Sequence, residues 1–161
     1  MAVVDSSAII PFLRAGRLSI FKQLWSKIKV PSGVSKEITE TRQGANIFFE
    51  ATADWVSVLE VEEKEANKIA LKEGLTPVDA EVLLLAIKEQ SPLVAGDRRL
   101  IQAAKAYGIK TYWTTEVLLE AVKQKKLSKK EAQLALDELI QNGLRISVEV
   151  YAALRNTIEK S

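Results

Sequence analysis

The sequence contains no cysteine and no histidine. Their absence excludes zinc fingers, thiol nucleophiles, Ser-His-Asp triads and acid–base catalysis by imidazole. An enzyme built from the remaining residues must use carboxylates, hydroxyls, Lys, Arg, Tyr or a bound ion. Because the available metal ligands are then oxygen atoms, the ions that suit this composition are Mg²⁺ and Mn²⁺.

The sequence also lacks long apolar runs and a strong charge of either sign. No stretch is long and apolar enough to span a bilayer, and residues 1–5 reach a carboxylate without a basic region before it. This beginning predicts a buried strand rather than a signal peptide, so we expect a cytoplasmic protein without membrane association. The formal net charge of +2 neither demands nor excludes a nucleic-acid partner.

Short strands and amphipathic helices alternate along most of the chain. Continuous or alternating apolar patterns predict strands at residues 2–4, 29–30, 55–58, 93–95 and 109–113. Apolar residues at i, i+3 and i+4 spacing predict helices at 8–13, 18–25, 32–38, 44–51, 62–73, 77–86 and 100–104. Thr114 or Thr115 is expected to cap another helix after the last strand. This order predicts an α/β fold of three layers, α/β/α, with a central, mainly parallel sheet.

The pattern changes near residue 127. Ser128–Glu131 has the form of a capping box, Asn142-Gly143 ends the helix that follows, and Ser147 begins another. We therefore expect one domain, residues 1–161, with an α/β core at 1–126 and a C-terminal helical extension at 127–161.

Three helix starts carry more specific expectations. Pro11 is expected near the beginning of its helix, where its missing N–H costs little. Ser32 is expected to cap the helix at 32–38. In Thr76-Pro77-Val78-Asp79, the threonine caps, the proline takes the first helical position and the acid lies in the first turn.

Two carboxylates follow the carboxyl ends of predicted parallel strands, where functional groups commonly lie. Asp5 directly follows the first strand, and Asp97 follows the strand at 93–95 after Gly96. Both should project from the carboxyl edge, where open α/β sheets bind their ligands. Asp79 begins the most apolar helix, whose N-terminal end can point to the same edge, whereas Glu37 is less constrained. Several carboxylates packed together repel one another unless a cation joins them.

Each acid also has a simpler explanation. Asp5 and Asp97 could be ordinary N-caps, Asp79 could complement a helix dipole, and Glu37 could lie on a solvated face. Glu81 is an alternative to Asp79, but two residues further on it should point to another face of the helix.

The order and spacing of these segments resemble the motifs of PIN domains, which include the toxin halves of VapBC-type toxin–antitoxin pairs. The matching segments are Val3-Val4-Asp5-Ser6-Ser7, Glu37, Thr76-Pro77-Val78-Asp79-Ala80 continuing to Ala86, and Leu93-Val94-Ala95-Gly96-Asp97-Arg98-Arg99-Leu100. They cover roughly the first 115 residues, and the tail is similar to one uncharacterised prokaryotic PIN subgroup. Many PIN toxins carry an acid or a threonine where this chain has Gly96.

This resemblance implies a Rossmann-like fold and an endoribonuclease that depends on Mg²⁺ or Mn²⁺. It assigns Asp5, Glu37, Asp79 and Asp97 as catalytic metal ligands, with Ser6 as a hydroxyl near the metal. Thr114 or Thr115 stands where the family often has a small polar residue or an acid, and Glu116 is an additional candidate ligand. The implied partners are an RNA substrate, an antitoxin protein and a second copy of the chain in a homodimer.

Basic and aromatic residues leave further alternatives open. Arg98 either binds an RNA phosphate or lies on a solvated helix face. The lysines between the last core helix and the tail are better explained as complements to helix dipoles; they are Lys123, Lys125, Lys126, Lys129 and Lys130. Trp25, Trp55 and Trp113 fall on apolar patterns and are expected in the core rather than as base-stacking platforms.

Two other classes of function compete with the nuclease. A catalytically silent PIN-like module would bind RNA or a protein, although the complete set of four acids favours an enzyme. A phosphoacceptor or hydrolase on a Rossmann-like sheet fits less well. The sequence lacks G-x-x-x-x-G-K-[ST] and G-x-G-x-x-G, and Asp5 is not followed by the Asp-x-Asp arrangement.

Overall fold

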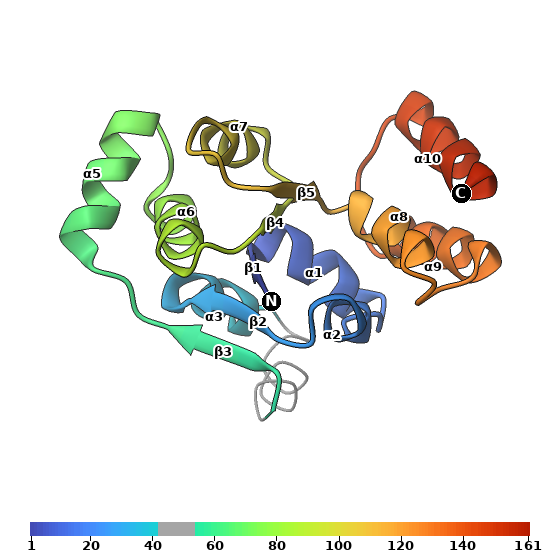
Figure 1. Cartoon of the computed structure of the whole chain (residues 1–161), viewed down its shortest axis with the longest axis horizontal. Helices are drawn as coiled ribbons and strands as arrows, with labels where there is room; N and C mark the ends of the chain where they lie inside the picture. The colour runs from blue at the N-terminus through green and yellow to red at the C-terminus, as the bar shows by residue number, and fades with distance from the viewer. Residues whose placement is uncertain (42–53) are drawn as a thin grey trace.

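A central parallel sheet organises the computed structural model, which describes residues 1–41 and 54–161. The strands are β1 (Ala2–Val4), β2 (Ile28–Pro31), β3 (Val56–Leu59), β4 (Leu93–Ala95) and β5 (Thr111–Trp113). They lie in the order β3-β2-β1-β4-β5, and each neighbouring pair is parallel. The predicted α/β fold with a parallel sheet is therefore confirmed (Figure 1).

Helices flank this sheet on both faces. They are α1 (Ser6–Arg14), α2 (Ser19–Trp25), α3 (Ser32–Thr39), α5 (Glu63–Glu73), α6 (Pro77–Glu89), α7 (Arg98–Ala106), α8 (Glu116–Lys123), α9 (Lys129–Gln141) and α10 (Val148–Lys160). The chain moves outward from β1 to β3 through α1, α2 and α3, then crosses back to β4 and β5 through α6 and α7. Right-handed crossovers in opposite directions place these two groups on opposite faces. The helix predicted at 44–51 lies outside the described residues.

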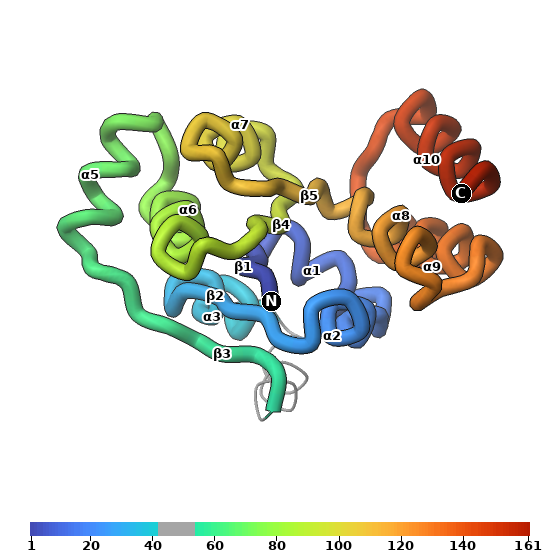
Figure 2. The backbone as a smooth tube through the Cα atoms, viewed as in Figure 1, coloured from blue at the N-terminus to red at the C-terminus, as the bar shows by residue number. Residues whose placement is uncertain are grey.

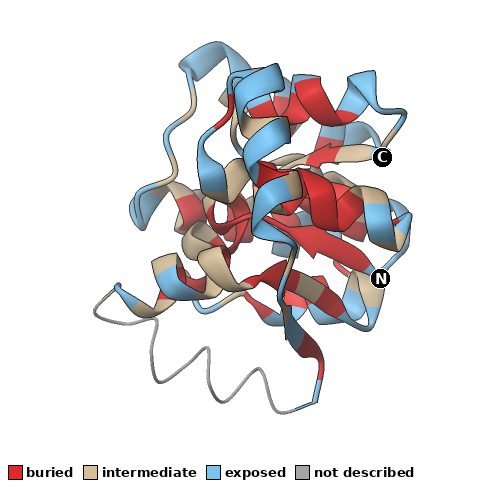
Figure 3. Ribbon diagram, turned by 90° about the vertical axis from the view of Figure 1, so that its left-hand side faces the viewer, coloured by how far each residue is buried: buried red, intermediate tan, exposed pale blue. Residues whose placement is uncertain are grey.

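The core lies on both sides of the two central strands. Every residue of β1 and β4 is fully buried, which explains why both strands are continuously apolar rather than alternating. Helix α6 is buried along most of its length for the same reason, since it packs between the sheet and the outer helix α5. Figure 3 shows this buried interior surrounded by exposed helix faces. The central strand ends are thereby held in fixed positions.

The tail forms a helical pair beyond β5, and Figure 2 shows its path around α8. Helix α9 buries Leu136 and Leu139, and α10 buries Leu154 and Ile158. Ser128 and Glu131 form the predicted capping box. Helix α9 is joined to the core by Arg17, whose Nε and Nη2 donate to the two carboxylate oxygens of Glu138 at 2.8 and 3.2 Å. Among the helices that the structure describes, none has the length and apolarity needed to cross a bilayer.

Local details differ from the sequence expectations at three helix starts. Pro11 lies in the interior of α1, because that helix already begins at Ser6. The N-cap of α3 is Pro31 rather than Ser32, whose hydroxyl instead donates to Glu60 at 3.1 Å. Thr115 is the N-cap of α8, but its side chain makes no capping hydrogen bond. The predicted strand at 109–113 also begins later, at Thr111.

Candidate active site at the carboxyl edge of the sheet

The sheet has a switch point between β1 and β4. Strand β1 pairs with β2 on one side and with β4 on the other, and the helices that follow β1 and β4 leave toward opposite faces. Open α/β sheets generally bind their ligands outside the carboxyl ends of the strands at such a switch point. Asp5 lies directly after β1, and Asp97 lies two residues after the end of β4, with Gly96 between them. The two strand-end acids therefore lie at the switch point.

Asp5 is a helix cap and also a buried carboxylate with one free oxygen. Its Oδ2 accepts a hydrogen bond from the Ser7 backbone N–H at 3.2 Å and another from the Ser7 hydroxyl. Its Oδ1 is buried and has no hydrogen-bond partner among the residues that the structure describes, and the residue is only 3% exposed. Burial raises the pKa of Asp5 above its ordinary value, and the charge of Glu37 adds to this rise. The capping explanation accounts for Oδ2 only.

Asp79 is the electrostatic centre of the group. It lies in the first turn of α6, and its backbone N–H donates to the Thr76 hydroxyl at 3.2 Å, as predicted for this helix start. Desolvation raises the pKa of Asp79 to about 6, and the charges of Asp5, Asp97 and Glu37 contribute to the rise. All four acids selected from the sequence are thus close enough to interact.

Glu37 reaches the group through a serine at the start of α1. The Ser6 hydroxyl, which is 7% exposed, donates to Oε2 of Glu37 across 31 residues of sequence. The neighbouring Ser7 hydroxyl donates to Asp5 and accepts from the Gly96 backbone N–H at 2.9 Å, so it joins the ends of β1 and β4. Sequence reasoning did not single out Ser7; its place two residues after an N-cap aspartate was the available signal.

Asp97 also combines two roles. Its Oδ1 accepts from the Leu100 backbone N–H at 3.0 Å and caps α7. None of Asp5, Glu37, Asp79 and Asp97 forms an ion pair with Lys or Arg among residues 1–41 and 54–161. Over the same residues, no three acidic side chains already converge as metal ligands. The acids are therefore electrostatic neighbours whose charges no described cation balances.

Glu81 lies against the start of α3 rather than beside Asp79. Its Oε2 lies against Gly33 at the start of α3, so closely that a methyl group at residue 33 would collide with it. Burial raises the pKa of Glu81, and the charges of Glu60 and Glu37 add to this rise, whereas the charge of Glu81 is not among those that act on Asp79. The structure therefore places Asp79, not Glu81, among the other acids, and it gives Glu81 a position between α3 and α6.

The glycine that departs from the PIN-toxin pattern has a steric cause. A Cβ atom at residue 96 would stand 2.8 Å from the Thr114 hydroxyl oxygen and 3.4 Å from the Ser7 carbonyl oxygen. Thr114 is 3% exposed, and its hydroxyl has no hydrogen-bond partner in the described part of the chain. Thr115 is half-buried beside it, and Arg98 is exposed at the first position of α7, next to Asp97. The Thr114 hydroxyl thus occupies space that a side chain at residue 96 would need.

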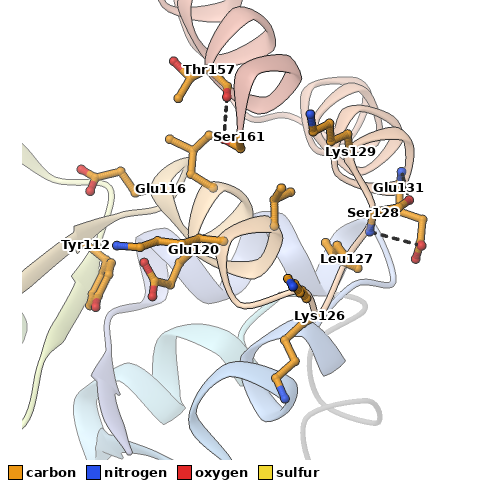
Figure 4. A pocket seen from close by; sticks show the side chains of 14 residues that line it. Tyr112, Glu116, Glu120, Lys126, Leu127, Ser128, Lys129, Glu131, Thr157 and Ser161 are labelled. Atoms are coloured by element: carbon orange, nitrogen blue, oxygen red, sulfur yellow. Dashed lines mark hydrogen bonds between the residues drawn. The ribbon is translucent and has the colours of Figure 1, made fainter.

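The lysine-rich segment lies around a different hollow. This hollow, of about 810 Å³, is lined by side chains of α8, the α8–α9 connection, α9 and the end of α10, and none of the four acids contributes to it. Lys126 and Lys129 line it, and so do Glu116, Glu120 and Glu131 (Figure 4). The lysines here share their surface with acids. This mixture agrees better with an ordinary solvated surface than with a phosphate-binding site.

The three tryptophans have unequal surroundings. Trp25 contacts the rings of Phe21 and Tyr112, with centroid distances of 6.0 and 5.5 Å, and Trp55 is 8% exposed. Trp55 belongs to the buried core, as expected, whereas Trp25 is half-buried and packs against the core. Trp113 is half-buried and lines a second hollow beside Ser7 and Gly96. For Trp113, the expectation of a purely structural position is therefore incomplete.

Comparisons with known proteins agree with this architecture. The sequence matches the family model described as DUF3368, a PIN domain, over residues 1–160. A search of curated proteins gives no match. Among solved structures, the chain is similar to a PilT N-terminus domain protein from the hyperthermophilic archaeon Sulfolobus solfataricus P2, with a TM-score of 0.56 and 18% identity over 75% of this chain and 92% of that chain. This structural likeness concerns the fold. Because the family model spans nearly the whole sequence, the chain belongs to the PIN-domain family.

Proposed function

We propose that this protein is an endoribonuclease that hydrolyses RNA phosphodiester bonds with the help of Mg²⁺ or Mn²⁺. The observation that carries the proposal is that Asp79 shares the switch point with three other carboxylates, whose charges add to the effect of burial and raise its pKa to about 6. Perturbed acids in a crevice are typical of functional sites. PIN-domain proteins are generally nucleases, so the family supports the same conclusion.

The residues at the edge suit a divalent cation in their chemistry. All four acids offer oxygen ligands, and the buried Oδ1 of Asp5 has no other partner in the described part of the chain. Asp5, Glu37, Asp79 and Asp97 would hold the cation, which when bound would activate water and stabilise charge on the scissile phosphate. Small side-chain rotations would have to draw the carboxylates inward, and neutralisation of their mutual repulsion favours that movement.

The surrounding side chains have supporting roles in this proposal. The hydroxyls of Ser6 and Ser7 hold Glu37 and Asp5 in place. Arg98 is exposed beside Asp97 at the N-terminus of α7, where both its own charge and the helix dipole attract a phosphate. Asp79 would lose its proton when the cation binds, because metal ligands must be deprotonated.

The test compares the parent protein with Asp97→Asn on single-stranded RNA, with Mg²⁺, Mn²⁺ or EDTA present. Asparagine can still accept the hydrogen bond from Leu100, so α7 keeps its cap and the fold should survive. We expect metal-dependent cleavage by the parent and its loss in the variant. The matched control is Asp137→Asn on α9, which should cleave like the parent. Equal rates for Asp97→Asn and the parent would refute the assignment.

One observation favours a second candidate, a catalytically silent PIN-like module that binds RNA or a protein. No three acids in the described part of the chain are already gathered around a common point. Titration calorimetry with Mn²⁺ separates the two functions. Heat of binding that disappears in Asp97→Asn supports the nuclease, whereas no binding by the parent supports the silent module.

A toxin–antitoxin role, a homodimer and a cytoplasmic location stay predictions from the sequence. A reading frame immediately upstream for a small protein with a DNA-binding N-terminus would support the toxin role. Sedimentation of the purified protein would test the homodimer.

A further inference from the structure

A hollow of about 440 Å³ lies next to the residues that adjoin two of the four acids, Asp5 and Asp97. The core lines it with Ser7, Gly96, Trp113 and Thr114, and the tail lines it with Arg145 and Ile146 from the α9–α10 connection. Ser7 contacts Asp5, and Gly96 immediately precedes Asp97, so the hollow opens beside the candidate active site. Its volume lies within the range of about 300–1,000 Å³ that is usual for small-molecule sites.

The chemistry of the walls favours a flat aromatic ligand with a polar edge. Trp113 and Ile146 provide apolar surface, to which the tail adds Leu144. Thr114 lines the hollow, and its hydroxyl is buried beside Gly96 with no hydrogen-bond partner within residues 1–41 and 54–161. Because an unpartnered buried hydroxyl costs stability, a ligand that bonds to it would be favoured. Arg145 is exposed at the rim, where a phosphate could reach its guanidinium.

The tail wall is held in place by polar contacts on both of its helices. Glu138 of α9 pairs with Arg17 of the core through two hydrogen bonds. The Tyr151 hydroxyl of α10 donates to Asp137 of α9 at 2.6 Å, so the two tail helices are joined next to their connection. A wall fixed before the ligand arrives lowers the entropy lost on binding and makes the hollow selective.

We propose that this hollow is a specificity subsite that binds one nucleobase of a single-stranded RNA, next to the phosphate that is cut. The inference rests on the proposed nuclease function, and it assigns the tail a role in forming one wall of the RNA-binding hollow. A single strand is required because a base must leave its stack to reach the hollow. Trp113 supplies stacking surface, Thr114 reads the edge of the base, and Arg145 contacts a neighbouring phosphate.

Three variants test these roles separately. Thr114→Val keeps the shape of the side chain and removes the hydroxyl, so discrimination between bases at one position relative to the cut should fall about tenfold. Val150→Trp places a large ring at the mouth of the hollow from a residue that is 44% exposed, so folding should be preserved while discrimination falls. Arg145→Ala should weaken binding to all sequences and reduce its dependence on salt.

The measurements are the base composition at each cleavage position in a randomised single-stranded RNA, and the affinity of short labelled RNA oligonucleotides for each variant in the Asp97→Asn background. Lys130→Gln, an exposed substitution on α9, is the matched control and should behave like the parent in both. Affinity for the preferred base should fall about tenfold with Val150→Trp.

The outcomes separate the subsite from the nuclease assignment. If the parent cleaves and Asp97→Asn does not, but Thr114→Val and Val150→Trp keep the parent's base preference and affinity, the subsite is wrong and the nuclease assignment stands. A protein segment would then be the better occupant of the hollow. If the parent never cleaves, yet base-dependent oligonucleotide binding is lost in Val150→Trp, the subsite stands and the nuclease assignment is wrong.

Discussion

Acidic side chains occupy two regions of this molecule in opposite electrostatic surroundings. In the tail, Glu138 pairs with Arg17, Asp137 accepts from Tyr151 and lies 3.5 Å from Arg155, and Glu131 completes a capping box. At the carboxyl edge, the four candidate ligands have no cationic partner among the described residues. The same type of residue is therefore balanced by positive charge in one region and left unbalanced in the other.

The pKa directions follow this difference. The guanidinium of Arg17 lowers the pKa of Glu138, whereas burial and like charges raise the pKa of Asp79 to about 6. The acids of the tail that pair with cations increase the stability of the fold, whereas the acids at the carboxyl edge, which repel one another, decrease it. An arrangement that reduces stability is retained where function requires it, and this is why the edge, rather than the tail, is the candidate active site.

The largest effect that would test this comparison is expected for Asp5→Asn. Loss of a metal ligand should lower metal-dependent RNA cleavage on the order of a thousandfold or more. The same change removes a buried charge that Glu37 repels, and asparagine can still cap α1, so the metal-free protein should gain about 1 kcal/mol of unfolding free energy. Cleavage assays and urea unfolding in EDTA measure the two quantities.

The opposite signs of these two changes distinguish a functional acid from a structural one. A variant that loses stability as well as activity would show that the capping bonds from Ser7 dominate at Asp5. Asp137→Asn serves as the control in the tail: there stability should fall and cleavage should stay unchanged, because its partners are Tyr151 and Arg155.

The sequence was sufficient to locate the strand-end acids. Asp5 and Asp97 follow short apolar strands, and the parallel sheet that those strands predict brings both to one edge. Asp79 could be assigned because Thr76-Pro77 specifies where α6 begins and therefore where its first turn lies. In each case a local pattern determines the position of the side chain.

Other features depend on packing that no local pattern records. Glu37 reaches the site only because the rotation of α3 brings it to Ser6, so the sequence could suggest it by family order alone. The second hollow combines Ser7, Gly96, Thr114 and Arg145, whose proximity arises from the way the tail folds back on the core. The interior position of Pro11 was missed because Asp5 starts α1 earlier than the apolar pattern indicates.

A smaller effect is expected in the pH dependence of stability. The folded protein holds the Asp79 proton more tightly than the unfolded chain, since the pKa rises from 3.8 to about 6. The resulting stabilisation is fully present below pH about 4 and is lost as the pH rises through about 6. In EDTA, we expect unfolding free energy to fall by about 1 kcal/mol over this interval, after allowance for solvent screening at a half-exposed carboxyl.

Urea unfolding at a series of pH values, for the parent and for Asp79→Asn, isolates this contribution. The variant should show a flatter curve over the same interval, and saturating Mg²⁺ should flatten the curve of the parent, because a bound cation favours the ionised carboxylate. Coincident curves for the two proteins in EDTA would mean that Asp79 is not the group that titrates.

The smallest effect is expected in the tail, for Glu138→Gln. Glutamine can keep a hydrogen bond to Arg17 but loses the charge. The side chains of Arg17 and Glu138 are partly exposed, at 28% and 30%, so the unfolding free energy should fall by at most about 1 kcal/mol. The difference should shrink in high salt, which screens partly exposed pairs. Cleavage should change less than twofold, because Glu138 is not among the groups that affect Asp5 or Asp79. A fall in cleavage far beyond the fall in stability would show that the tail acts on the carboxyl edge, and the two regions would then have to be treated as a single functional unit.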